Sequence, residues 1–205
     1  MYTQNNEEEI IGNYFGRKVG NVLSIGENDG KTFSNALALI EKGWGALLIE
    51  PSQKVWPKLV NLHKDNKRVY LANYAIGESH VKEAVLYDSG DFLIKGTCSL
   101  LSTLKPTEMK RWGNVQFEQA KCEMITVEQA LEFAPYKIYH FISIDCEGYD
   151  WEILQQIDLD VLGCECIILE HNSVPRVVNL FENYVLPHGF QRVGYNQENI
   201  IFGRK

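Results

Sequence analysis

The chain has 205 residues, a length that fits a single α/β domain. Its 45% hydrophobic and 23% charged residues are ordinary for a folded soluble protein. The net charge of −7 argues against nucleic acid or an anionic membrane as a partner, because both are bound largely through cationic surfaces. No apolar run approaches the ~20 residues of a membrane span, and the polar, acidic first residues lack the pattern of a secretory signal.

The chain contains five cysteines, an odd number without the spacing of a metal site. Cys164 and Cys166 fall in an apolar run that reads as a strand, so we expect a buried, reduced pair on one face of it. Reduced thiols indicate an intracellular compartment, and we expect a cytoplasmic protein. The oligomeric state stays open.

The first third of the chain alternates apolar strands with helical patterns. Apolar runs predict three buried strands, at 20–26, 45–51 and 68–73. Helical spacing after the first strand predicts a helix that Gly43 ends, with a face made of Phe33, Ala36, Leu37 and Ile40. A second helix is expected through Leu59 and Leu62, with Pro57 in its first turn.

The alternation resumes after residue 121, and the stretch 87–121 reads as an insertion over one end of the sheet. Thr126 and Gln129 form a capping-box pattern, and Ser173 is the expected N-cap of the last helix. Further strands are predicted at 139–145, 164–170, 189–195 and 199–205. Strands that alternate with helices predict a parallel sheet covered on both faces, and a closing hairpin makes it mixed at one edge.

Two glycines flank the loop that follows the first strand. In such sheets ligands bind at the carboxyl ends of the strands, where Gly26 permits a sharp turn and close approach of a ligand. A tight turn without a ligand would explain Gly26 and Gly30 equally well. Glu50 decides for an adenosine ligand, because it ends the second strand where ribose hydroxyls would be bound. Glu27 and Asp29 suit the cationic sulfonium and amino group of S-adenosylmethionine better than a pyrophosphate.

Over residues 22–170 the chain resembles the FkbM-type family of S-adenosylmethionine-dependent methyltransferases. The residues that carry the resemblance are Gly26, Asn28, Gly30, Glu50, Pro51, Asn73, Ser99, Glu128, Asp145, Glu147 and Gly148. The most specific match is the segment "SIDCEGYDWEIL", similar to the Ile-Asp-x-Glu-Gly run of the family. The chain departs from the family at Ser24, where an acid is expected.

The resemblance implies a Rossmann-like class I fold with a seven-stranded, mostly parallel sheet in the order 3-2-1-4-5-7-6 and helices on both faces. One domain is expected over 1–205, with 87–121 as a cap near the acceptor site. The expected activity is O-methylation of a sugar or other small hydroxylated molecule. The alternative, to which Ser24 gives weight, is a non-catalytic binding or interaction protein. The residues expected to bind the donor are Gly26, Glu27, Asn28, Gly30, Glu50, Pro51, Asn73 and Asp145.

Catalytic candidates end the fourth and fifth strands of the predicted sheet. Asp145 and His171 are candidate general bases, with Glu147 in the surrounding shell. Alternatively, Asp145 and Glu170 hold a divalent cation, Mg²⁺ or Ca²⁺, which would activate the acceptor hydroxyl. Structural roles compete with each assignment, since acids favour helix N-termini and a rim histidine is common. The cationic segment 104–112 is either a solvated helix or a lid over the acceptor.

Overall fold

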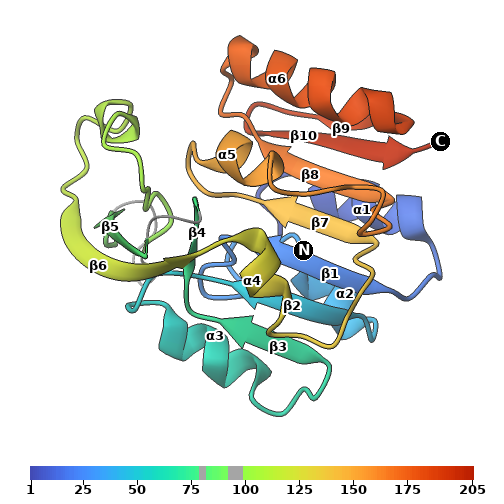
Figure 1. The fold of residues 1–205 in the computed structure, drawn as a ribbon, viewed down its shortest axis with the longest axis horizontal. Coiled ribbons are helices and arrows are strands. Elements are labelled where there is room, and N and C mark those ends of the chain that lie inside the picture. Colours follow the sequence, from blue (N-terminus) through green and yellow to red (C-terminus); the bar gives the residue numbers. More distant parts are fainter. Residues whose placement is uncertain (79–81, 92–98) are drawn as a thin grey trace.

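A computed structural model describes residues 1–78, 82–91 and 99–205. Its main sheet has seven strands in the order β3-β2-β1-β7-β8-β10-β9 (Figure 1). Counted along the chain within this sheet, the order is 3-2-1-4-5-7-6, so the prediction is confirmed. Only β10 runs antiparallel to its neighbours β8 and β9. The strands are β1 (Asn21–Ile25), β2 (Gly45–Ile49), β3 (Val69–Ala72), β7 (Phe141–Ile144), β8 (Cys166–Glu170), β9 (Phe190–Tyr195) and β10 (Asn199–Arg204).

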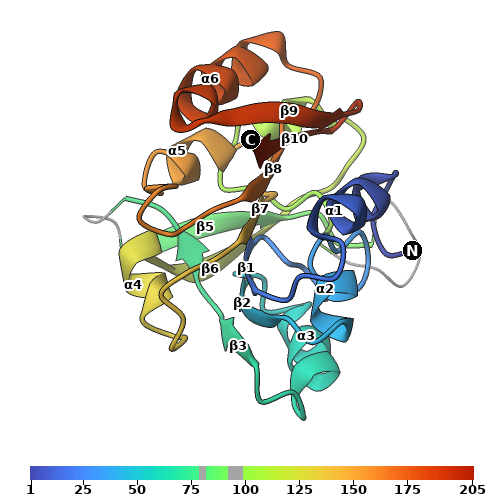
Figure 2. The same ribbon diagram turned by 90° about the vertical axis from the view of Figure 1, so that its right-hand side faces the viewer.

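Helices cover both faces of the main sheet, as Figure 2 shows. One face carries α1 (Glu7–Phe15), α2 (Leu37–Glu41) and α3 (Trp56–His63). The other carries α4 (Val127–Leu131), α5 (Asp150–Leu154) and α6 (Pro175–Val185). Alternate side chains of each strand enter the core under one set or the other, which explains why the strands are apolar throughout. Among the helices described, none is long and apolar enough to cross a membrane.

A second, three-stranded sheet lies beyond the carboxyl ends of the parallel strands (Figure 1). It consists of β4 (Ala75–Ile76), β6 (Glu118–Ile125) and β5 (Glu83–Asp88), and Leu86, Cys122 and Met124 contribute to its own small core. The predicted insertion 87–121 therefore begins inside β5 and ends inside β6. The described part of the insertion includes a short 3-10 helix, η1 (Glu108–Lys110). Outside the insertion, a second 3-10 helix, η2 (Leu186–His188), follows α6.

Local signals in the sequence predicted some helix ends and missed others. The capping box is present, with the Thr126 hydroxyl accepting from Gln129 N–H at 3.2 Å, and the α3 proline lies in the first turn. The expected Ser173 cap is wrong, because its hydroxyl donates to the Gln197 carbonyl at 2.7 Å instead. The helix after β1 is shorter than predicted, since Phe33 has a φ of +60° and the helix begins only at Leu37.

The cysteine pair near β8 is buried and free, but it is not on one face of the strand. Cys164 precedes the strand and packs in the core beneath α4 to α6, whereas Cys166 packs beneath α1 to α3. The expectation of a shared face is therefore wrong. Thr97 and Cys98, which belong to the segment matched to the family around Ser99, lie outside the described residues.

Candidate functional site

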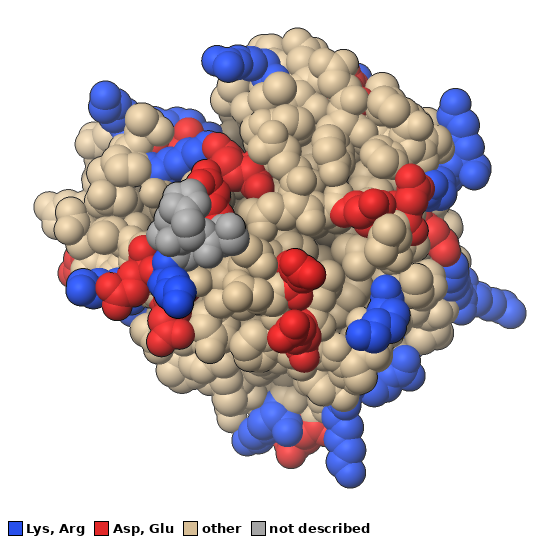
Figure 3. All heavy atoms as spheres, in the orientation of Figure 1, with Lys and Arg blue, Asp and Glu red and all other residues tan. Residues whose placement is uncertain are grey.

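A cavity of about 350 Å³ opens at the carboxyl ends of the parallel strands, between the main sheet and the second sheet. On the face shown in Figure 3, acidic side chains gather where the lobe of the second sheet meets the body of the molecule. The cavity brings together most of the predicted site residues: Gly26, Glu27, Asn28, Glu50, Pro51, Asp145, Glu147 and Glu170. Gly30, Asn73 and His171 are absent from its lining.

Gly26 joins the end of β1 to the end of β7. Its φ is +85°, and a Cβ at this position would lie 1.8 Å from the carbonyl oxygen of Asp145. Its N–H donates to the Ile49 carbonyl at 2.9 Å. Only glycine fits this close approach, which places the loop, Asp145 and the end of β2 side by side.

The second glycine and the second acid of the loop have structural roles. A Cβ at Gly30 would lie 2.6 Å from the Leu59 side chain, so this glycine allows the loop to pack on α3. Asp29 accepts hydrogen bonds from the N–H groups of Lys31 and Thr32, at 2.9 and 2.7 Å, and does not line the cavity. Of the two acids in the loop, only Glu27 reaches the cavity.

The family has an acidic residue at the position of Ser24, and in this chain Glu27 places a carboxyl group beside that position. The Ser24 hydroxyl donates to one oxygen of Glu27 at 2.5 Å, and the Ser34 hydroxyl donates to the other at 2.6 Å. Burial raises the pKa of Glu27 to about 7. Although Ser24 replaces the expected acid, the Glu27 carboxyl group, which contacts Ser24, still lies at the end of β1.

The Glu50 carboxylate is held by the backbone. Ser52 N–H donates to its Oε1 at 2.7 Å, and Asn28 N–H donates to its Oε2 at 2.9 Å. Burial raises the pKa of Glu50 to about 7 despite these donors. The Asn73 carboxamide donates to the Glu50 carbonyl at 2.7 Å, so Asn73 supports the end of β2 from outside the cavity.

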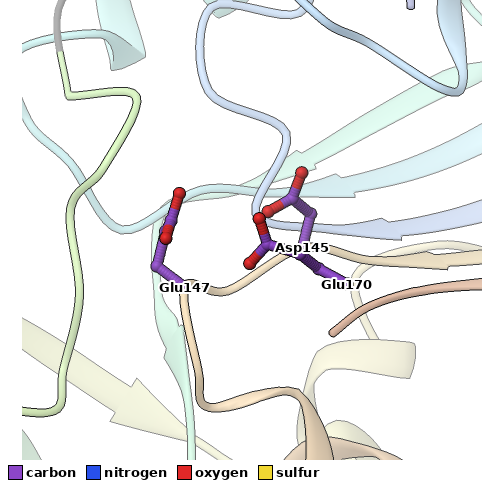
Figure 4. A group of neighbouring side chains, drawn as sticks. All are labelled: Asp145, Glu147 and Glu170. Atoms are coloured by element: carbon purple, nitrogen blue, oxygen red, sulfur yellow. The ribbon is translucent and has the colours of Figure 1, made fainter. Parts of the chain in front are cut away.

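Asp145, Glu147 and Glu170 form an acidic cluster at the ends of β7 and β8 (Figure 4). One oxygen from each lies within 4.8 Å of the others. Glu147 has a φ of +46°, a left-handed conformation that is uncommon for glutamate. Oε2 of Glu170 is buried and has no hydrogen-bond partner in the described structure. Burial raises the pKa of all three carboxyl groups, that of Asp145 to about 6 and those of Glu147 and Glu170 further above the ordinary value.

Arg111 faces this cluster and was not predicted as a site residue. It follows η1 and donates to Oε2 of Glu147 at 2.9 Å, and the Thr103 hydroxyl donates to the Glu147 carbonyl at 2.8 Å. Among the described residues that line the cavity, Arg111 is the only lysine or arginine. The cationic segment is therefore fastened over the acids. Sequence spacing gave no signal for this contact, because the two partners are 36 residues apart.

His171 does not line the main cavity but a second, smaller one of about 290 Å³, which Glu170 and Arg111 also line. Its Nδ1 accepts a hydrogen bond from Ser173 N–H at 3.0 Å, and its ring stacks on Tyr195 with centroids 4.8 Å apart. Burial lowers its pKa, which favours the neutral ring. These contacts face the β9–β10 hairpin, so the structure brings Asp145 but not His171 to the main cavity. A role for His171 as a base stays a prediction.

A buried hydrogen-bond network ties the second sheet to the end of β2. Asp88 is 1% exposed and accepts from the hydroxyls of Ser52 and Ser99, at 3.0 and 2.8 Å. Lys54 lies 3.3 Å from its other oxygen. The family match had indicated Ser99, but an aspartate at a strand end gave no signal of its own. Since Ser52 also holds Glu50, the network connects the second sheet to the predicted donor site.

The sheet order, the glycine loop after β1 and the acidic rim beside it define a class I methyltransferase fold. The structure is similar to a ribosomal protein L11 methylase from Lactobacillus delbrueckii subsp. bulgaricus, with a TM-score of 0.52 and 10% identity over 97% of this chain and 77% of that one. It is also similar to a precorrin-6y C5,15-methyltransferase from Geobacter metallireducens GS-15, with a TM-score of 0.51 and 12% identity over 100% of this chain and 90% of that one. At these identities the likeness shows the fold alone.

The sequence also matches a family model, described as "Methyltransferase FkbM domain", over residues 24–191. The chain belongs to the FkbM methyltransferase family, as the resemblance predicted. A comparison with curated proteins gave no match.

Proposed function

We propose that this methyltransferase uses S-adenosylmethionine to methylate a hydroxyl group of a sugar or another small molecule. The observation that carries the proposal is that one cavity is lined by the glycine loop, by Glu50 and by Asp145. A donor held by the first two would present its methyl group to an acceptor beside the third. The strand order supports this arrangement, because β2, β1 and β7 are successive neighbours in the sheet.

Glu50 is suited to bind the donor ribose. Each of its oxygens accepts one backbone N–H and keeps a lone pair for a ribose hydroxyl. Glu27 lies one strand further along the rim, where its carboxyl group would attract the positively charged methionine part of the donor. Between them, Gly26 lets the loop after β1 pack directly against the Asp145 carbonyl. These features fit S-adenosylmethionine better than an anionic pyrophosphate.

Asp145 is suited to accept the proton of the acceptor hydroxyl. In the transfer, the acceptor oxygen bonds to the methyl carbon as the bond from that carbon to sulfur breaks. The hydroxyl proton passes to Asp145, and S-adenosylhomocysteine leaves. With its pKa raised by burial to about 6, Asp145 is a stronger base than an ordinary aspartate and is still ionised at neutral pH.

The acidic cluster also fits a divalent cation. Hard cations such as Mg²⁺ and Ca²⁺ prefer carboxylate oxygens, and the unpartnered Oε2 of Glu170 is such a ligand. Asp145 and Glu170 would hold the ion, and its charge would lower the pKa of a bound acceptor hydroxyl. If the ion takes part, a chelator should slow methyl transfer, and added Mg²⁺ or Ca²⁺ should restore it.

The alternative, a non-catalytic binding protein, drew its weight from Ser24. Glu27 beside Ser24 supplies a carboxyl group in its place, and we therefore favour catalysis. The test is to incubate the purified protein with methyl-labelled S-adenosylmethionine and a panel of hydroxylated small molecules. Label in an acceptor supports the proposal. Donor binding without transfer to any acceptor favours the alternative, and absence of donor binding contradicts the proposed methyl transfer.

A further inference from the structure

One wall of the main cavity is built from the N-terminal segment and from the turn between β9 and β10. Gln4 comes from the N-terminal segment, whereas Gln197 and Glu198 come from the turn between β9 and β10, and all three line the cavity. In the pairing of β10 with β8, Asn199 lies opposite Glu170. The turn therefore lies at the same rim as the acidic cluster, on the side away from Glu50. We call Gln4, Asn172, Gln197 and Glu198 the amide wall.

Glu7 holds the two halves of the amide wall together. Its side chain is fully buried, and its Oε1 accepts from the carboxamides of Asn196 and Asn199, at 2.7 and 3.1 Å. Its Oε2 accepts from Asn5 N–H at 2.8 Å. The Asn5 carboxamide also donates to Glu198 at 3.2 Å. These bonds fix the N-terminal segment to the hairpin turn, so the wall has a defined shape.

Most of this wall lies outside the part of the chain that the family shares. The family match covers residues 24–191, whereas Gln4, Glu7, Gln197 and Glu198 fall before or after it. The donor loop, Glu50 and the acidic cluster all lie within the match. Most of the wall is therefore separate from the part of the cavity that matches the family model.

The chemistry of the wall points to hydroxyl groups on an uncharged molecule. In the described part of the chain, no hydrogen bond occupies the side-chain carboxamides of Gln4, Asn172 and Gln197. A carboxamide offers two donors and an acceptor oxygen, which match the donor and acceptor pair of a hydroxyl. Glu198 is the acidic group of the wall, and Arg111, the cation that lines the same cavity, is already paired with Glu147 and Glu108. A carboxylate or phosphate on the acceptor would therefore be repelled or left unpaired.

We infer that the amide wall is the acceptor subsite and that it selects a neutral, polyhydroxylated acceptor of the sugar type. This inference rests on the methyltransferase function proposed above. It also separates two tasks along the rim: the shared loop and Glu50 bind the donor, whereas the chain ends choose the acceptor. The acceptor would lie over β8 and β10, with one hydroxyl directed at Asp145.

The test uses matched pairs of neutral and anionic sugars as probes. Protein saturated with S-adenosylhomocysteine is titrated with methyl glucoside or galactose, and in parallel with glucuronate or galacturonate. The readout is the nitrogen-15 NMR signals of the Gln4, Asn172 and Gln197 carboxamides, assigned by single substitutions. We expect the neutral sugars to shift these signals and to bind about tenfold more tightly than their anionic partners, a difference of roughly 1.4 kcal/mol.

Variants then separate the wall from the donor site. The double substitution Gln4→Ala with Gln197→Ala should weaken sugar binding about tenfold and leave the affinity for S-adenosylhomocysteine within about twofold. Gln119→Ala, at an exposed carboxamide on β6, should change neither. Unshifted carboxamide signals, equal binding of anionic sugars, or an unaffected double variant would each overturn the inference. Failure of S-adenosylhomocysteine to bind would contradict the proposed donor site instead. The same sugar titration without it would still show whether the amide wall binds neutral sugars.

Discussion

The carboxylate of Glu50 is oriented before any ligand arrives, because backbone N–H groups of Asn28 and Ser52 each hold one of its oxygens. A charge-assisted hydrogen bond to a ribose hydroxyl contributes about 1.5–3 kcal/mol. Glu50→Ala should therefore weaken binding of S-adenosylhomocysteine by about 10- to 100-fold in calorimetry. Glu118→Ala, whose side chain is 76% exposed, is the control and should bind like the parent. Equal affinity in both variants would remove Glu50 from the donor site.

The same residue predicts how donor binding depends on pH. Burial raises the pKa of Glu50 to about 7, so the carboxyl is largely protonated below that pH in the free protein. Ribose hydroxyls donate to the ionised form, and binding at low pH must therefore release a proton. The affinity for S-adenosylhomocysteine should rise about tenfold from pH 6 to pH 8 and level off above it. Glu50→Gln should make this profile shallower, and the pH dependence that remains should come from Glu27, whose pKa is also about 7. A flat profile in the parent would contradict the prediction.

Asp145 and His171 compete for the role of general base, and the structure brings only Asp145 into the main cavity. A general base contributes typically ~10²–10⁴-fold in rate. Asp145→Asn should reduce the turnover of an identified acceptor by that order and change affinity for S-adenosylhomocysteine little. His171→Gln should reduce turnover by less than about tenfold. The opposite ranking in a steady-state assay would make His171 the base.

At the scale of elements, the site depends on how closely the loop after β1 meets the end of β7. An alanine Cβ at Gly26 would collide with the Asp145 carbonyl and add the strain of a positive φ. Gly26→Ala should lower the free energy of unfolding in urea by about 2–4 kcal/mol. Gly43→Ala separates the two effects, because its φ is +90° and nothing lies within 4 Å of the added methyl. It should cost about 1–2 kcal/mol, and equal losses would argue against the collision.

The order of elements was predictable because parallel strands and their helices carry strong local patterns. The apolar runs of β1, β2, β7 and β8 follow from burial on both faces, and the family motifs fixed the order of the sheet. The second sheet was not predictable in the same way. Its strands β5 and β6 pair across about thirty residues, with Asp88 opposite Glu118, and their alternation of exposed and buried residues is weak. Helix α1 was also missed, although its acidic first turn is a pattern that favours the start of a helix.

In the candidate site too, residues at local sequence patterns were predicted, whereas residues whose roles depend on long-range contacts were not. Gly26, Glu50 and Asp145 were found because each stands at a strand end, where the topology brings them together. Arg111 and Asp88 were missed, because their roles come from contacts between distant segments that no spacing in the sequence reveals. Gly30 and Asp29 have the local roles of packing and turn capping, although their position in the loop suggested ligand contact.

At the scale of the whole molecule, acidic residues form a continuous row along the rim of the main sheet. It runs from Glu50 at β2, past Glu27 after β1 and Asp145 at β7, to Glu170 at β8. The second sheet borders this row of residues on one side, and the amide wall borders it on the other. In the proposed function, this arrangement gives the donor and the acceptor separate places on one edge of one sheet. Burial at this rim raises the pKa of Glu27, Glu50 and Asp145.

The most direct test of this account is a crystal structure of the protein with S-adenosylhomocysteine. We expect the ligand in the main cavity, with its ribose hydroxyls on Glu50, its amino group toward Glu27 and its sulfur on the side of Asp145. An ordered ligand elsewhere on the protein, or the ligand in this cavity with its ribose away from Glu50, would contradict the account.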